Sequence, residues 1–302
     1  MLNPNIWRSQ QQSFNWQNLN ICYQDQGEGP VLLLLHGLPG SSWDWHPLWP
    51  MLVGQFRLIA ADFPGCGDSD KPLNYDYRLT DQADAILSLL NHLNIEHYQI
   101  IAHDYGAAVS TELMASDQPP EAVSWITPRL CGNREGFLWR ERWISEPSGK
   151  LLRRWLTMGL YGRYLETLTG PFARLTTQRL HDSWQLLCAH QGLQVLPRLF
   201  NYRFELPLAE ELQHEAFDAP VQVISGEFDP LRRALPPLTR LPQHRLGCGH
   251  FPHLEDPEKL SLLLLDFHCA TNHESHAVFS NLKDTESQSS SSASLASARL
   301  MR

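Results

Sequence analysis

Paired cysteines are absent from this chain. Its 302 residues include six cysteines that are scattered along the sequence, and no C-x-x-C motif occurs. This spacing argues against a disulfide framework and against a cysteine-based zinc site, and it is typical of reduced thiols in a cytoplasmic protein. We therefore expect no metal site, and no sequence motif calls for a cofactor. The oligomeric state is not readable from the sequence.

Long apolar runs and an excess of positive charge are also missing. Apolar runs such as 31–35 and 262–265 are far too short to span a bilayer, and residues 1–12 lack the apolar core of a signal peptide. The net charge is −9, with no face dense in lysine and arginine, which argues against nucleic acid as a partner. The sequence predicts a soluble, cytoplasmic protein without a membrane span.

No G-x-S-x-G motif occurs anywhere in the chain, so no serine stands at the turn where many hydrolases carry their nucleophile. A largely apolar run, 98–102, instead leads through Ala102-x-Asp104-x-Gly106 into a helix-forming segment. Small residues on both sides of Asp104 suit a sharp turn in which a strand and a helix pass close together. Asp104 is thus a candidate nucleophile, although an aspartate here could also simply cap the helix.

The order of apolar segments predicts an α/β fold. Residues 14–23 alternate loosely and lead to a turn at 26–30, which indicates an N-terminal hairpin. Further strand signals alternate with helical ones, which predicts a mostly parallel sheet with helices on both faces; these strand signals lie at 31–35, 56–61, 98–102, 123–127 and 220–226.

The domain organisation follows from where this alternation stops. Between 132 and 213 strand signals disappear and helical segments follow one another, which predicts a helical cap inserted into the core. The core then comprises 1–131 and 214–272. The Ser-rich segment 273–302 has almost no apolar periodicity and is predicted to be a disordered tail.

Two more titratable residues follow predicted strands, at the sheet edge where ligands bind in such folds. Asp229 lies in Gly-Glu-Phe-Asp-Pro, and His250 closes Gly-Cys-Gly-His. A lone histidine can be structural, and an aspartate before proline often only forms a turn. Together with Asp104, however, they give the order nucleophile, acid, histidine that α/β-hydrolases use.

These motifs resemble the aspartate-nucleophile branch of the α/β-hydrolase superfamily, the epoxide hydrolases and haloalkane dehalogenases. The resemblance covers roughly residues 14–270, and in its motifs the chain is most similar to the mesoderm-specific-transcript subgroup. It rests on four signatures: His36-Gly37-Leu38-Pro39, Asp62 to Pro72, His103-Asp104-Tyr105-Gly106, and Gly249 to Pro257.

The resemblance implies covalent catalysis. Asp104 would attack a saturated carbon and form an alkyl ester, and His250, oriented by Asp229, would activate the water that hydrolyses it. The backbone N–H groups of Leu38 and Tyr105 would form the oxyanion hole, whereas Pro39 has no N–H to offer.

The resemblance favours an epoxide hydrolase that produces vicinal diols from small, apolar substrates and water. Tyr202, in Phe-Asn-Tyr-Arg, matches the position of the tyrosine that donates a proton to the opening ring; Tyr161 or Tyr164 could share this role. Dehalogenases commonly have Asn and Trp where this chain has Leu38 and Tyr105, and no arginine directly follows Asp104 as in fluoroacetate-type enzymes. A haloalkane dehalogenase-like hydrolase and a non-catalytic ligand-binding protein of the same fold remain the alternatives.

Overall fold

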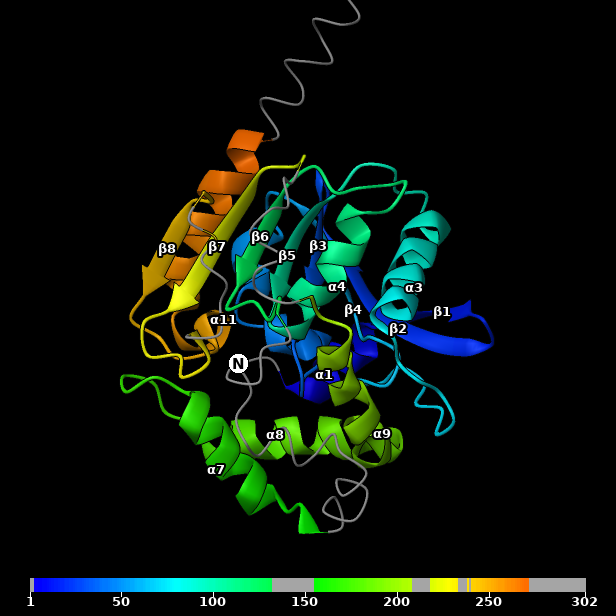
Figure 1. The fold of residues 1–302 in the computed structure, drawn as a ribbon, viewed down its shortest axis with the longest axis vertical. Coiled ribbons are helices and arrows are strands. Elements are labelled where there is room, and N and C mark those ends of the chain that lie inside the picture. Colours follow the sequence, from blue (N-terminus) through cyan, green and yellow to red (C-terminus); the bar gives the residue numbers. More distant parts are fainter. Residues whose placement is uncertain (1–2, 132–154, 208–217, 233–237, 239, 272–302) are drawn as a thin grey trace, which may run out of the picture. The chain divides into compact units, whose positions relative to one another are not determined.

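An eight-stranded sheet forms the centre of the protein (Figure 1). The computed structural model describes residues 3–131, 155–207, 218–232, 238 and 240–271. The strand order is β1-β2-β4-β3-β5-β6-β7-β8, in which β1–β2 and β2–β4 pair antiparallel and all other neighbours pair parallel. The mostly parallel α/β sheet predicted from the sequence is therefore confirmed; its strands are β1 (Gln12–Trp16), β2 (Leu19–Gln26), β3 (Val31–Leu35), β4 (Arg57–Ala61), β5 (Gln99–His103), β6 (Val123–Ile126), β7 (Val221–Gly226) and β8 (Gln243–Leu246).

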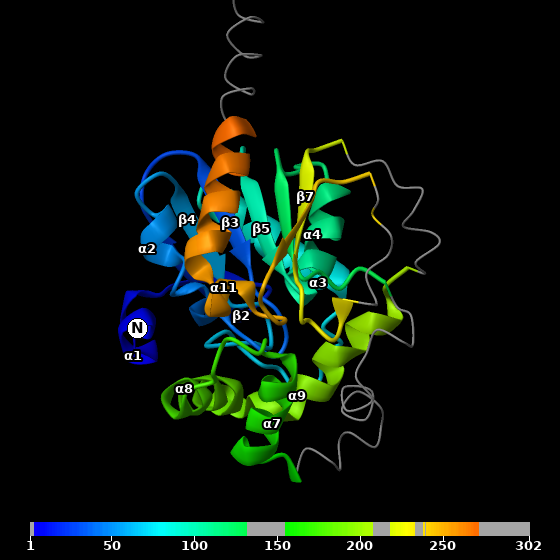
Figure 2. The same ribbon diagram turned by 90° about the vertical axis from the view of Figure 1, so that its left-hand side faces the viewer.

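Helices cover both faces of this sheet (Figure 2). On one face lie α3 (Leu79–His92) and α4 (Tyr105–Met114), and on the other lies α2 (Trp49–Leu52). Because both faces are covered, the central strands need apolar side chains at successive positions rather than alternate ones. Residues 32–35 of β3 are accordingly all inaccessible to solvent.

The N-terminal hairpin differs from the prediction in the position of its turn. β1 and β2 are joined through Gln17 and Asn18, which both have positive φ, 48° and 66°. A two-residue turn with positive φ at both positions matches the right-handed twist of the paired strands. The predicted turn at 26–30 instead connects β2 to β3. The preceding helix α1 (Pro4–Gln10) was not expected from the sequence.

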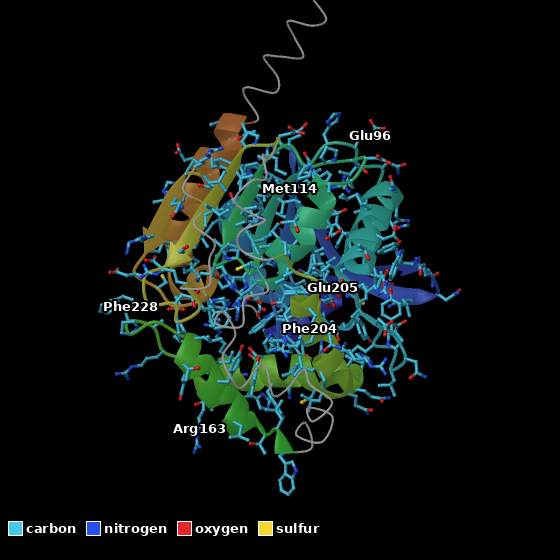
Figure 3. All side chains as sticks on the ribbon, viewed as in Figure 1. Glu96, Met114, Arg163, Phe204, Glu205 and Phe228 are labelled. Carbon is cyan, nitrogen blue, oxygen red and sulfur yellow. The ribbon has the colours of Figure 1, made fainter. Side chains whose placement is uncertain are left out.

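The helices inserted between β6 and β7 lie beyond the carboxyl ends of the strands (Figures 1 and 2). They are α7 (Met158–Leu168), α8 (Thr177–Cys188) and α9 (Gly192–Leu199), followed by the 3-10 turn η5 (Phe200–Phe204). Glu205, labelled in Figure 3, connects this segment to the core because its carboxylate accepts the backbone N–H of Leu79 at the start of α3 (3.0 Å). We refer to α7, α8 and α9 as the inserted helices.

Parts of the predicted domains lie outside the described residues. These are 1–2, 214–217, 233–237, 239 and 272 of the expected core, 132–154 and 208–213 of the expected cap, and 273–302 of the expected tail. Residues up to Leu262 form one compact unit, which contains everything discussed below. The second unit begins at Leu263, and its described residues, 263–271, are helical.

Candidate active site

The connection between β5 and α4 is a strained turn centred on Asp104. The backbone of Asp104 has φ 48° and ψ −111°, a conformation that a residue with a side chain rarely adopts. Gly106 follows two residues later, where an added Cβ would lie 2.3 Å from the carbonyl oxygen of Leu35. The absence of a side chain at Gly106 thus allows α4 to start against the end of β3, and Asp104 projects from the tip of the turn.

The three predicted titratable residues come together at this turn. Asp229 follows β7 and His250 follows β8, so the parallel order of the strands brings both to the edge where β5 ends. The Nδ1 atom of His250 lies 3.0 Å from Oδ2 of Asp229, and its Nε2 atom lies 3.3 Å from Oδ1 of Asp104. All three side chains are buried, so the histidine bridges two carboxylates away from bulk water.

A fourth charged group, Arg129, was not identified from the sequence. It follows β6, and its Nε–H donates to Oδ1 of Asp104 (2.9 Å), while its backbone N–H donates to the Asp104 carbonyl oxygen (3.2 Å). The side chain is only 6% exposed. The sequence offered one signal: Arg129 follows a strand end, as the other three groups do.

Electrostatic interactions among these groups set their protonation. Burial by itself would raise the pKa of Asp104, but the charges of Arg129 and His250 hold that pKa well below its usual range. Burial would lower the pKa of His250, yet the carboxylates of Asp229 and Asp104 outweigh it and raise the pKa to about 9. The resting site therefore contains two carboxylates, a guanidinium and an imidazolium.

One oxygen of Asp104 accepts from one of the two backbone N–H groups predicted to form the oxyanion hole. The backbone N–H of Leu38 donates to Oδ2 of Asp104 (3.0 Å). Tyr105 is the first residue of α4, so its N–H belongs to the group that has no acceptor within the helix. The two oxygens of Asp104 thus have different environments: Oδ2 accepts the backbone N–H of Leu38, and Oδ1 lies between Arg129 and His250.

The remaining motif residues support this geometry. His36 accepts the backbone N–H of Phe63 at Nε2 (3.2 Å), and its Nδ1 lies 2.8 Å from the Gly37 carbonyl oxygen, so His36 holds the loop after β3. At Gly37, an added Cβ would lie 2.8 Å from the Cβ of Asp104. Pro39, which follows Leu38 through a cis peptide bond, is also part of this loop. His103 Nε2 lies 2.9 Å from the backbone oxygen of His250 and ties the two loops together.

The three candidate proton-donating tyrosines differ in their surroundings, and Tyr202 contacts the residue that follows Asp104. It is buried in η5, and its ring centroid is 4.7 Å from that of Tyr105, the residue after Asp104. Tyr161 packs instead against Trp184, with centroids 5.7 Å apart. Tyr164, on the same helix as Tyr161, is half-buried.

Two other expectations from the sequence concern metal binding and membrane insertion. Within the described residues, no cluster of three or more His, Cys, Asp or Glu side chains is arranged to hold a metal ion. Over the same residues, no helix is both long and apolar enough to cross a bilayer.

Comparison with known proteins places this chain in a family. A family model described as alpha/beta hydrolase fold matches residues 30–127. The mesoderm-specific transcript protein of Mus musculus is 30% identical over 287 residues, which cover 83% of this chain and 83% of the mouse protein.

Solved structures share the fold at lower sequence identity. An alpha/beta hydrolase fold protein from Burkholderia ambifaria has a TM-score of 0.71 at 24% identity, covering 84% of this chain and 97% of its own. The epoxide hydrolase CorEH has a TM-score of 0.67 at 20% identity, covering 86% of this chain and 98% of its own. From its fold, its turn at Asp104 and its identity to the mouse protein, the chain belongs to the α/β-hydrolase family and is related within it to the mesoderm-specific transcript proteins.

Proposed function

We propose that this hydrolase opens epoxides to vicinal diols through a covalent ester on Asp104. The observation that carries the proposal is the arrangement of the Asp104 carboxylate. Its Oδ2 accepts the Leu38 N–H, and its Oδ1 lies 3.3 Å from His250. A carboxylate held at an oxyanion hole is suited to become an ester carbonyl that water later attacks.

In the first step, Oδ1 of Asp104 attacks an epoxide carbon and the ring C–O bond breaks. The departing oxygen becomes an alkoxide, which must receive a proton. Tyr202 supports this role because it is buried against Tyr105 beside the nucleophile. The Tyr202 hydroxyl gives its proton to the ring oxygen and is left as a phenolate.

In the second step, His250 removes a proton from water, and the hydroxide attacks Cγ of Asp104. The oxyanion develops on Oδ2, where the Leu38 N–H already donates. The bond from Cγ to Oδ1 then breaks, Oδ1 leaves as a hydroxyl oxygen of the diol, and His250 returns its proton to this leaving alcohol. The new Asp104 carboxyl group gives its proton to His250, which restores the resting imidazolium. The Tyr202 phenol is restored earlier, when the imidazolium gives up its proton, and the cycle balances as epoxide plus water to diol.

Ester formation itself converts His250 into a base. In the resting site the Asp104 carboxylate is one of the groups that raise the pKa of His250 to about 9. The ester is neutral, so it no longer stabilises the imidazolium, and the proton of His250 passes to the Tyr202 phenolate. Asp229 stays hydrogen-bonded to Nδ1 at 3.0 Å and keeps the ring oriented.

The setting of the reaction is part of the proposal. The substrate is a small organic epoxide with a mostly apolar body, since the inserted helices bring Leu186, Leu196 and Leu199 against the loop that carries Leu38. All six cysteines are free thiols, which supports a cytoplasmic location.

A trapped intermediate tests the mechanism. His250→Gln should still be alkylated at Asp104 but hydrolyse the ester slowly, because only the second step needs the base. After incubation with an aryl epoxide, mass spectrometry should find an adduct on the peptide that carries Asp104. His97→Gln, which changes an exposed histidine, serves as a control and should turn over like the wild type. An adduct elsewhere, or none despite wild-type turnover, contradicts the proposal.

A further inference from the structure

Arg129 occupies a position that the chain maintains at an energetic cost. Thr127, two residues earlier, has φ 41°, which is a strained conformation for a β-branched residue. Its hydroxyl donates to the backbone oxygen of His250 (2.9 Å), so the strained residue is fixed to the catalytic loop. A buried ion pair such as Arg129 with Asp104 adds little stability by itself, because desolvation offsets the attraction. Strain and burial together indicate that this guanidinium has a function.

The charges of the site explain what the guanidinium could serve. Asp104 and Asp229 balance Arg129 and the imidazolium of His250 in the resting state. Alkylation of Asp104 removes one negative charge from this group. A substrate that brings its own negative charge would keep Arg129 in a buried ion pair throughout the reaction.

We propose that Arg129 binds a carboxylate attached to the epoxide ring, so that the preferred substrates are epoxy acids rather than neutral epoxides. The inference rests on the function proposed above and names its substrate class. It leaves the rest of the substrate apolar and makes Arg129 a specificity-determining residue.

The direction of attack is compatible with a carboxylate bound at Arg129. In a productive complex the attacked carbon lies about 3–3.5 Å from Oδ1 of Asp104, with the ring oxygen on the far side. The other substituents of that carbon project sideways and remain near Oδ1. The Arg129 Nε atom is 2.9 Å from this same oxygen, and a guanidinium presents its donors in a fork that matches a carboxylate.

Binding of the carboxylate would also activate the nucleophile. In the resting state, Oδ1 of Asp104 accepts a charge-assisted hydrogen bond from Arg129, which lowers its nucleophilicity. A substrate carboxylate competes for the same guanidinium donors and frees a lone pair on Oδ1. A neutral epoxide has no charge with which to compete, so it meets a nucleophile that is still engaged.

The test compares a 2,3-epoxy acid with its primary amide, which has nearly the same shape but no charge. The wild type should prefer the acid in kcat/KM by roughly 10- to 100-fold, the range of a hydrogen bond to a charged group. Arg129→Met should lose this preference and Arg129→Lys should keep part of it. Arg57→Met, which removes an arginine paired to Asp25 at the start of β4, should retain the wild-type ratio.

A second measurement does not depend on turnover. A cyclopropanecarboxylate and its amide have the ring shape but cannot be opened, and calorimetry should show at least tenfold tighter binding of the acid to the wild type. Equal binding and equal turnover of acid and amide in the wild type would overturn the inference and leave the proposed function intact, even if the Arg129 variants fail to fold. If none of the epoxides tested yields a diol and no adduct forms on Asp104, the proposed function itself is overturned.

Discussion

Tyr202 is the residue at which epoxide opening and halide release differ. An alkoxide is a far stronger base than a halide, so it needs a proton donor that a halide does not need. Removing one donor from a developing oxyanion typically costs about 2.7–4 kcal/mol, or roughly 10²–10³ in rate. Tyr202→Phe should therefore lose about this much activity with an epoxide and less with any haloalkane that reacts.

Steady-state assays of diol and halide release would check this prediction. Tyr23→Phe, which removes a hydroxyl that donates to Gln12 in the N-terminal hairpin, is the matched control and should change little. Unchanged epoxide turnover in Tyr202→Phe would remove this residue as the acid. Halide release without any epoxide opening would favour the dehalogenase alternative.

At the residue scale, the sequence was informative where a titratable residue follows the end of a predicted strand. Asp104, Asp229 and His250 could be picked out because each stands in a recognisable turn after an apolar run. Arg129 also follows a strand, but its neighbours Pro128 and Leu130 form no such pattern. Its side chain reaches Asp104 through the strained backbone at Thr127, and that backbone conformation is not visible in the residue types.

At the scale of elements, the short helix α11 (Pro252–Glu255) joins the inserted helices to the histidine loop. The Glu255 carboxylate accepts the backbone N–H groups of Gly249 (2.9 Å) and Phe251 (3.2 Å), on either side of His250, and of Gly170 (2.9 Å), just after α7. The His250 N–H also donates to the Leu168 carbonyl oxygen at the end of α7 (2.7 Å). Glu255 is thus a positioning residue for His250.

Replacing Glu255 should affect the second catalytic step more than the first. In Glu255→Gln one acceptor oxygen becomes an NH₂ group, so at least one of the three backbone N–H groups loses its acceptor. We expect hydrolysis of the ester to slow by roughly 10- to 100-fold, as for a lost hydrogen bond to a charged group, with a smaller effect on alkylation. Single-turnover kinetics would separate the two steps.

Glu258→Gln is the control for this experiment because Glu258 is exposed in the helix that follows α11. A purely structural role of Glu255 would slow both steps alike and lower thermal stability in proportion. Equal slowing of alkylation and hydrolysis would therefore contradict the positioning role.

The sequence predicts whether a segment is a strand or a helix more readily than it predicts how these elements are connected. Continuous apolar runs identified the central strands because burial on both faces leaves no other choice of side chains. The hairpin turn was misplaced because Gln17 and Asn18 adopt positive φ without a glycine, whereas Gly27 and Gly29 drew attention to the next connection. The position of the turn is set by which residues of β1 and β2 pair, and this pairing cannot be read from the residues of the turn alone.

At the scale of the whole molecule, several buried histidines are kept neutral near the site. Burial, together with the neighbouring His250, lowers the pKa of His103 to about 3. Burial likewise lowers the pKa of His36 and, well below its usual value, that of His253. In an unfolded chain such histidines titrate near pH 6.5, so the unfolded state binds more protons below that value.

The free energy of unfolding should therefore fall as the pH drops from about 6.5 towards 4, by about 1.4 kcal/mol per pH unit for each such histidine. His103→Asn should reduce this slope by about one proton. His250 acts in the opposite sense, since its pKa is raised to about 9 and its contribution is lost as the pH rises towards that value. Urea titrations between pH 4 and 8 would measure the slope; an identical slope in His103→Asn would contradict the assignment.

The shared carboxylate of Glu255 also has a thermodynamic consequence for the molecule. Because one side chain holds both Gly170 and the backbone around His250, the two segments are energetically coupled. Such coupling is reciprocal. If a ligand on the inserted helices favours one arrangement of the histidine loop, then fixing the loop in that arrangement strengthens binding of the ligand by the same free energy. Binding of a ligand to the inserted helices and the arrangement of His250 as the base are therefore governed by one equilibrium.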